Sequence, residues 1–104
     1  MLNIGVVGVG HLGKIHAEIL QKSIFFNLIG IFDINKHTRN KLSKKLSIKN
    51  YTSFNQLLEE CDVIDIVTPT NNHFNYAKQA LKKGKHIFIE KPITKKIEEA
   101  LELI

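Results

Sequence analysis

Three glycines and one aspartate give the sequence its first chemical signal. Gly8, Gly10 and Gly13 form a G-x-G-x-x-G pattern after an apolar run, and Asp33 stands twenty residues beyond the last glycine. In such a loop the glycines allow a tight turn, a close approach of the backbone to a pyrophosphate, and close packing of the helix that follows. An acidic side chain at the position of Asp33 accepts hydrogen bonds from the ribose hydroxyls of an adenosine. The pattern therefore predicts a dinucleotide-binding loop.

The charge of Asp33 bears on which dinucleotide binds. A carboxylate at this position repels a 2′-phosphate, so the sequence favours NAD over NADP. Lys36 and Arg39 lie close to Asp33 in the sequence, and their positive charges weaken the preference for NAD. The positive surplus of the whole chain would also attract a phosphate-bearing cofactor.

Two later segments stand where strands are expected to end. Thr68-Pro69 closes the fourth apolar run, and Glu90-Lys91-Pro92 follows the fifth. Ligands of open parallel sheets bind at the carboxyl ends of the strands. Partial burial there, beside a positive nicotinamide, would lower the pKa of Lys91 and suit it to proton transfer. On spacing alone, an ordinary strand-to-helix loop and a surface lysine in a turn also explain these segments.

These residues fall at the junctions of alternating strands and helices. Short apolar runs predict strands at residues 2–7, 28–32, 49–52, 63–67 and 86–89. Helical spacing of apolar residues predicts helices from the glycine loop to residue 22, at 36–46, after an N-cap at Ser53, at 71–83 before Gly84, and after an N-cap at Thr94. This alternation indicates an α/β fold with a doubly wound parallel sheet of five strands.

The last expected helix has no strand after it. A crossover helix returns the chain to a parallel sheet, yet the sequence stops at the apolar Leu101, Leu103 and Ile104. We therefore expect residues 1–104 to form one dinucleotide-binding domain that lacks its last strand and a second domain. The unpaired sheet edge would invite self-association.

Length and composition fit one soluble domain. The 104 residues are 43% hydrophobic and 24% charged, which is usual for globular proteins. No apolar run approaches the ~20 residues that span a bilayer, and the start of the chain lacks the pattern of a signal peptide. A single cysteine, Cys61, and five dispersed histidines offer neither a disulfide framework nor metal-ligand spacing. We expect a cytoplasmic protein without metal or membrane segment, with Cys61 at the edge of a strand.

The formal net charge of +5 raises the question of nucleic acid. The basic residues are almost all lysines scattered over expected helix faces, and only Arg39 could form a bidentate contact. No aromatic residues interleave with them as a base-stacking platform requires. We therefore expect no nucleic-acid partner.

Longer motifs at both ends of the chain carry a family resemblance. GVVGVGHLGKIHA near the start and TPTNNHFNYAKQALKKGKHIFIEKPIT near the end, with Asp33 between them, resemble the glucose-fructose oxidoreductase / inositol dehydrogenase (Gfo/Idh/MocA) family. The T-P-x-x-x-H and G-K-H-x-x-x-E-K-P patterns are far more specific than the glycine motif. The resemblance covers essentially the whole chain but only the first, Rossmann-type domain of that family. It implies a second α/β domain with substrate contacts and a further catalytic histidine, and a homo-oligomer.

The resemblance also implies a role for individual residues. It makes Lys91 the catalytic lysine, whereas Thr70 departs from the asparagine of many members and His16 is left out as a structural residue. The implied cofactor-binding residues are Gly8, Gly10, His11, Leu12 and Gly13 for the pyrophosphate, Asp33 and Ile34 for the adenosine ribose, Thr68, Pro69 and His73 for the nicotinamide side, and Glu90 and Lys91 for the nicotinamide ribose and the reacting carbon.

Two functions remain open at this point. In the first, the complete protein is an oxidoreductase that transfers a hydride between NAD and a hydroxyl-bearing carbon of a sugar, nucleotide sugar or cyclitol, with Lys91 taking the hydroxyl proton and the protein orienting the cofactor. The isolated 104-residue chain would then be inactive. In the second, the chain is a free-standing dinucleotide-binding module without catalysis.

Overall fold

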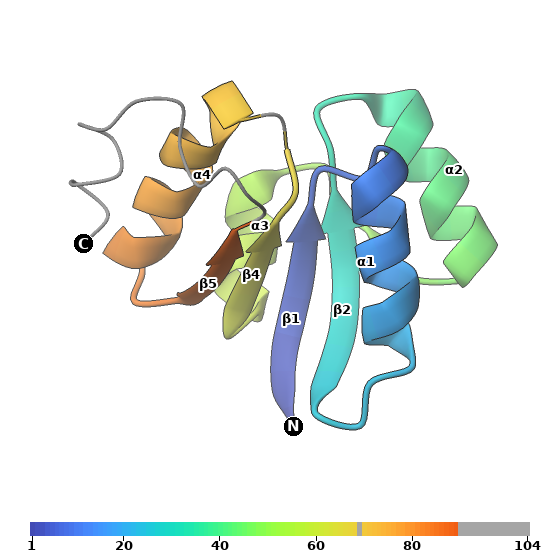
Figure 1. The fold of residues 1–104 in the computed structure, drawn as a ribbon, viewed down its shortest axis with the longest axis horizontal. Helices are drawn as coiled ribbons and strands as arrows, with labels where there is room; N and C mark the ends of the chain where they lie inside the picture. The colour runs from blue at the N-terminus through green and yellow to red at the C-terminus, as the bar shows by residue number, and fades with distance from the viewer. Residues whose placement is uncertain (69, 90–104) are drawn as a thin grey trace.

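The computed structural model describes residues 1–68 and 70–89, which form a five-stranded parallel sheet (Figure 1). Its strands are β1 (Leu2–Val7), β2 (Phe26–Phe32), β3 (Lys49–Asn50), β4 (Val63–Ile66) and β5 (His86–Ile89). They lie side by side in the order β3-β2-β1-β4-β5. The chain winds outward from β1 to β3, then returns and winds outward through β4 and β5, which confirms the doubly wound α/β fold. The strand order reverses between β1 and β4, where sheets of this kind bind ligands.

Helices cover both faces of the sheet. Those of the described residues are α1 (His11–Gln21), α2 (Lys36–Leu46), α3 (Phe54–Glu60) and α4 (Thr70–Lys82). Consecutive residues of a strand point to opposite faces, and accordingly Val6 packs with α1 and α2 while Val7 packs with α3 and α4. None of the helices in residues 1–68 and 70–89 is long and apolar enough to cross a membrane.

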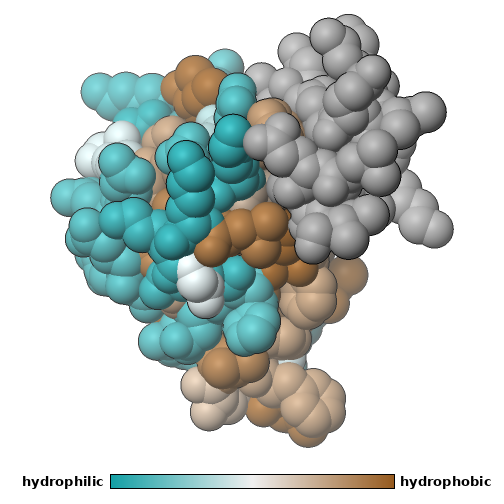
Figure 2. Space-filling model, turned by 90° about the vertical axis from the view of Figure 1, so that its left-hand side faces the viewer, coloured by the Kyte–Doolittle hydropathy of each residue, from teal (hydrophilic) through white to brown (hydrophobic). Residues whose placement is uncertain are grey.

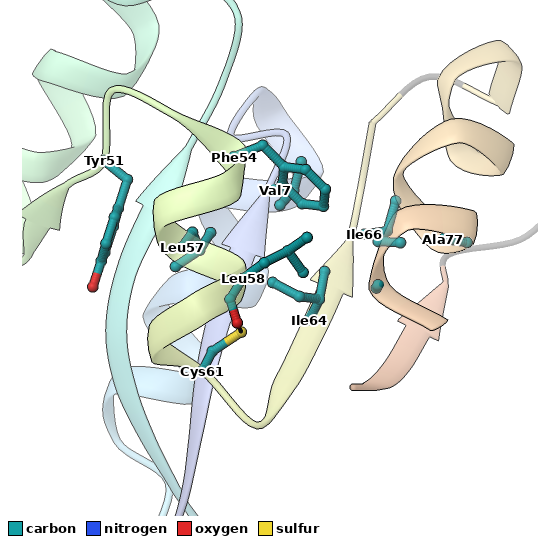
Figure 3. Close-up of a cluster of buried hydrophobic side chains, with 10 residues drawn as sticks. Val7, Tyr51, Phe54, Leu57, Leu58, Cys61, Ile64, Ile66 and Ala77 are labelled. Atoms are coloured by element: carbon teal, nitrogen blue, oxygen red, sulfur yellow. Dashed lines mark hydrogen bonds between the residues drawn. The ribbon is translucent and has the colours of Figure 1, made fainter. Parts of the chain in front are cut away.

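The core on the α3 and α4 side places these helices firmly against the sheet. Leu57 and Leu58 of α3 belong to one buried cluster with the sheet residues Val7 and Ile64, and Figure 3 shows Leu58 directed toward Ile64. All four side chains are completely buried. Full burial of each such side chain is worth about 1.5–3 kcal/mol. The positions of α3 and α4 relative to the ends of the strands are therefore fixed by packing.

Several element boundaries differ from the sequence predictions. β2 begins at Phe26 rather than Leu28, because Phe26 pairs with Leu2 and its ring packs edge-on against Phe88, with 5.9 Å between centroids. β3 ends at Asn50, because the chain turns after Tyr51 toward the N-cap of α3. β4 ends at Ile66 and α4 begins at Thr70, and each of these boundaries is one residue earlier than expected. The helix expected after Thr94 lies outside the described residues.

The predicted helix ends are largely confirmed. Ser53 caps α3, its hydroxyl accepting a hydrogen bond from the backbone N–H of Gln56. Gly84 follows α4 with a left-handed φ of 73°. Cys61 was expected at a strand edge, but it is the C-cap of α3, where it is 1% exposed and its thiol donates to the carbonyl of Leu58 (Figure 3).

The end of the sheet where β1 starts carries exposed apolar side chains. Figure 2 shows apolar surface at the lower end of the molecule, the same end as the N-terminus in Figure 1. Met1, Leu2, Ile24 and Phe25 are the exposed apolar residues of the β1 start and of the turn between α1 and β2. The glycine loop is at the opposite end of β1. The apolar end and the candidate site described next are therefore separate surfaces.

Candidate functional site

The loop between β1 and α1 needs glycine at two positions for different reasons. Gly8 has a φ of 90°, which side chains of L-residues rarely tolerate, and a Cβ there would lie 2.7 Å from the backbone nitrogen of Thr68. A Cβ on Gly13 would lie 1.7 Å from the carbonyl oxygen of Gly8. The first glycine therefore permits the turn, and the second permits α1 to begin directly against the end of β1.

The first turn of α1 is open toward solvent. Its N-cap, Gly10, makes no side-chain hydrogen bond, and the turn contains no acidic residue. In contrast, α2 is capped by Asn35, whose Oδ1 accepts a hydrogen bond from the N–H of Thr38, and α3 is capped by Ser53. A Cβ on Gly10 would meet no atom within 4 Å. The free N–H groups and the positive end of the helix dipole therefore face a space that an anion can enter.

The carboxylate of Asp33 is fixed at the end of β2 by the backbone. Its Oδ2 accepts a hydrogen bond from the N–H of Val9 (2.8 Å), and its Oδ1 accepts one from the N–H of Asn35 (2.8 Å). Each carboxylate oxygen has a further lone pair for a ligand. Asp33 thus joins the glycine loop to the start of α2 and still presents two acceptors.

Arg39 does not face the ligand side of Asp33. It is 9% exposed, and its Nη1 donates to the backbone carbonyl of Asp33 (3.3 Å). The sequence had suggested that Arg39 would temper the preference of Asp33 for an unphosphorylated ribose. The guanidinium is instead packed behind the loop, so its charge is engaged by the backbone and not directed at a ribose.

These features line one cleft of about 620 Å³ at the carboxyl ends of β1, β2 and β4. Its walls include eight residues that the sequence singled out, namely Gly8, Gly10, His11, Leu12, Gly13, Asp33, Ile34 and Thr68. Leu12 and Ile34 are 42% and 73% exposed, so the cleft has apolar walls beside its polar ones. A cleft of this size and mixed lining can hold a dinucleotide.

Three further residues line the cleft that the sequence analysis had not singled out, namely Asn35, Val67 and Tyr76. The ring of Tyr76 packs against that of Phe54, with 4.7 Å between centroids. Burial, and next the negative charge of Asp33, raise the pKa of Tyr76, so its hydroxyl stays protonated and able to donate a hydrogen bond. Tyr76 lies at the middle of α4, and no sequence motif marks it as a cleft residue.

The structure does not place the other expected site residues. Pro69, Glu90 and Lys91 lie outside the described residues. His73 belongs to α4, but its side chain is likewise outside the described part. The described cleft is thus the half of the expected site formed by β1, β2 and β4.

His16, set aside as structural in the sequence, lies away from the cleft. Its Nδ1 is 2.7 Å from Oδ2 of Asp65, a residue of β4 that is 4% exposed. This contact links α1 to the middle of the sheet. Sequence spacing does not reveal this contact, because the two residues are 49 positions apart in the chain.

The described residues support neither a nucleophilic cysteine nor a metal site. Burial raises the pKa of Cys61 to about 11, so its thiol is protonated near neutral pH and a poor nucleophile. Within residues 1–68 and 70–89, no group of three or more His, Cys, Asp or Glu side chains could hold a metal ion.

Several proteins with similar sequences are named as dehydrogenases. The chain is 41% identical over 103 residues to the UDP-N-acetylglucosamine 3-dehydrogenase of Acidithiobacillus ferrooxidans, an alignment that covers 99% of this chain and 32% of that protein. It is 31% identical over 100 residues to the glucose-6-phosphate 3-dehydrogenase of Bacillus subtilis, covering 96% and 29%. The chain therefore spans about a third of the length of the curated relatives it matches.

Solved structures and a family model agree with these relatives. The Acidithiobacillus ferrooxidans enzyme superposes with a TM-score of 0.90 at 40% identity, covering 98% of this chain and 33% of that one. GenD2 from gentamicin A biosynthesis, solved in complex with NAD, superposes with a TM-score of 0.92 at 25% identity, covering 98% and 30%. The model of the oxidoreductase family with the NAD-binding Rossmann fold matches residues 2–104. The chain belongs to this family, Gfo/Idh/MocA.

Proposed function

We propose that the chain is the cofactor-binding domain of a dehydrogenase that uses NAD to oxidise a hydroxyl group of a sugar, nucleotide sugar or cyclitol. The observation that carries the proposal is the cleft at the strand-order reversal, where the glycine loop, the open first turn of α1 and the Asp33 carboxylate meet. Relatives named for UDP-N-acetylglucosamine, glucose 6-phosphate and inositols support the substrate class. Because the chain spans about a third of their length, the reaction is proposed for the complete enzyme.

Each wall of the cleft has a proposed part in holding the cofactor. The N–H groups at the start of α1 bind the pyrophosphate, which approaches over Gly10. The two free acceptors of Asp33 bind the hydroxyls of the adenosine ribose, and Ile34 offers an apolar contact to the adenine. Thr68, with Pro69 and His73, is assigned to the nicotinamide side.

The proposed chemistry at the reacting end belongs to residues that follow β5. Bound NAD supplies the hydride acceptor. Lys91 accepts the proton of the substrate hydroxyl while the hydrogen on the same carbon leaves as hydride, so that the hydroxyl carbon becomes a carbonyl. Glu90 is assigned to the nicotinamide ribose. This division leaves the described cleft with binding and orientation, and Lys91 with the proton.

The choice between NAD and NADP provides the first test. NAD is expected to bind the unmutated chain more tightly than NADP, because the fixed carboxylate of Asp33 accepts from ribose hydroxyls and repels a 2′-phosphate. Hydrogen bonds to charged groups are worth about 1.5–3 kcal/mol, so Asp33→Ala is expected to weaken NAD binding by roughly 10-fold or more. The difference between the affinities for NAD and NADP should become smaller or change sign. Isothermal titration calorimetry with both dinucleotides measures each affinity.

A second variant separates charge from shape in this test. Asp33→Asn keeps the size of the side chain but removes its charge, so it should narrow the gap as Asp33→Ala does. Both variants need a thermal melt, because Asp33 also holds Val9 and Asn35. NADP binding equal to or tighter than NAD on the unmutated chain would show that Asp33 does not select the ribose.

A further inference from the structure

A second pocket lies beside the cofactor cleft, between α1 and α2. It encloses about 290 Å³ and shares Gly10 and His11 with the cleft, so the two spaces adjoin across the start of α1. Its lining residues are Val9, Gly10, His11, Lys14, His37, Thr38, Lys41, Leu42 and Lys45. We call this space the lysine pocket.

The lysine pocket is lined by cations and by no acidic side chain among the described residues. Lys14 extends from α1, and Lys41 and Lys45 extend from α2 across the pocket. The acidic group in contact with this cluster is Glu18, whose Oε1 lies 3.2 Å from Nζ of Lys45. This ion pair involves Lys45, so the three lysines of the pocket carry more positive charge than the carboxylate of Glu18 balances.

The lysines also act on one another. The pKa of Lys14 is lowered, chiefly by the close approach of the Lys45 side chain and its positive charge, and the charge of Lys41 adds to the effect. Two ammonium groups brought this close are stabilised by an anion between them. The pocket also lies beside the first turn of α1, where the helix dipole is positive.

We propose that the lysine pocket binds a phosphate group, held by Lys14, Lys41 and Lys45. The phosphate has two sources. One is the 2′-phosphate of NADP bound in the adjoining cleft, and this source rests on the proposed function. The other is phosphate from solution. Arg39 is engaged with the carbonyl of Asp33, whereas Lys14, Lys41 and Lys45 are exposed and line the pocket that a phosphate can enter.

Asp33 and the lysine pocket act in opposite directions on the affinity for NADP. The negative charge of Asp33 repels a 2′-phosphate, whereas the positive charges of the adjoining lysine pocket attract one. With the first source, NADP binds more weakly than NAD but retains an affinity that depends on the lysines.

The test compares a pocket variant with a control from the same helix. The pocket variant is Lys41→Gln/Lys45→Gln, and the control is Lys44→Gln, which removes one positive charge from α2 at a position outside the pocket lining. NAD, NADP and inorganic phosphate are titrated into each, with calorimetry for the dinucleotides and amide chemical shifts for phosphate. The pocket variant is expected to bind NADP about 10-fold more weakly, because two charge-assisted contacts are lost. Its NAD affinity should change less than two-fold.

Each result either identifies the source of the phosphate or refutes binding of phosphate in the lysine pocket. Selective loss of NADP affinity in the pocket variant supports the 2′-phosphate as the source. Phosphate-dependent shifts of pocket amides that vanish in the pocket variant, without a change for NADP, support phosphate from solution. The proposal is overturned if the NADP affinity and the phosphate-dependent amide shifts are the same in the unmutated chain, the pocket variant and the control. An unmutated chain that fails to bind NAD would refute the proposed function, while the phosphate titration would still test the lysine pocket.

Discussion

Replacing Lys91 with alanine in the complete enzyme is expected to lower kcat by about 100-fold or more, the scale of a positioned acid or base. The affinity for NAD should change little, because the described cleft that is proposed to hold the cofactor is built from other residues. Lys91→Arg should fail to restore turnover, since a guanidinium does not give up its proton near neutral pH. Steady-state kinetics with the substrate, together with an NAD titration, separates the two effects.

An exposed lysine on the preceding helix is the matched control for this experiment. Lys82 lies in α4 and its side chain is exposed, so Lys82→Ala removes the same charge without touching the proposed site. It should retain the kcat of the unmutated enzyme. A Lys91→Ala enzyme that keeps most of its turnover would return Lys91 to the role of a surface lysine.

Gly13→Ala is expected to damage both the fold and the cofactor site. The new Cβ would lie 1.7 Å from the carbonyl oxygen of Gly8, and a backbone atom cannot move aside as a flexible side chain can. Overpacking of this kind costs typically about 1–3 kcal/mol. A domain of this size loses roughly 4–8 °C in Tm for each kcal/mol. NAD binding should fall below detection, because α1 must shift away from the loop.

Gly10→Ala separates the two effects of the loop. Its Cβ would meet no protein atom within 4 Å, and its φ of −68° suits alanine. Stability should therefore fall by less than about 1 kcal/mol, the scale of an N-cap change. NAD affinity should still drop, because the methyl group occupies the path of the pyrophosphate. A Gly10→Ala chain that binds NAD as well as the unmutated one would place the pyrophosphate elsewhere.

The parts of the fold and site that sequence could predict are those encoded by short-range patterns. The glycine spacing and Asp33 mark the ends of β1 and β2, and alternation of apolar runs with helical periods gives the doubly wound sheet. Ser53 and Gly84 were found because a cap acts within its own turn. In each case the residues that interact are close in the chain or belong to a recurrent motif.

The features that sequence missed depend on contacts across the fold. Tyr76 reaches the cleft because α4 packs against β4 and β5 and its ring meets Phe54 of α3, contacts that no local pattern encodes. Asp65 meets His16 across 49 residues of sequence. Arg39 turns toward the backbone of Asp33 and not toward a ligand. The early start of β2 at Phe26 likewise depends on Leu2 and Phe88, which lie in other strands.

The most direct test of the central claim is an NMR titration of the chain with NAD. Saturable changes are expected in the amide shifts of the cleft, at Gly10, Leu12, Gly13 and Ile34, while the amide shift of Leu57 in the core on the α3 side stays unchanged. The absence of saturable changes, or changes confined to residues outside the cleft, would contradict the assignment of this cleft to the cofactor.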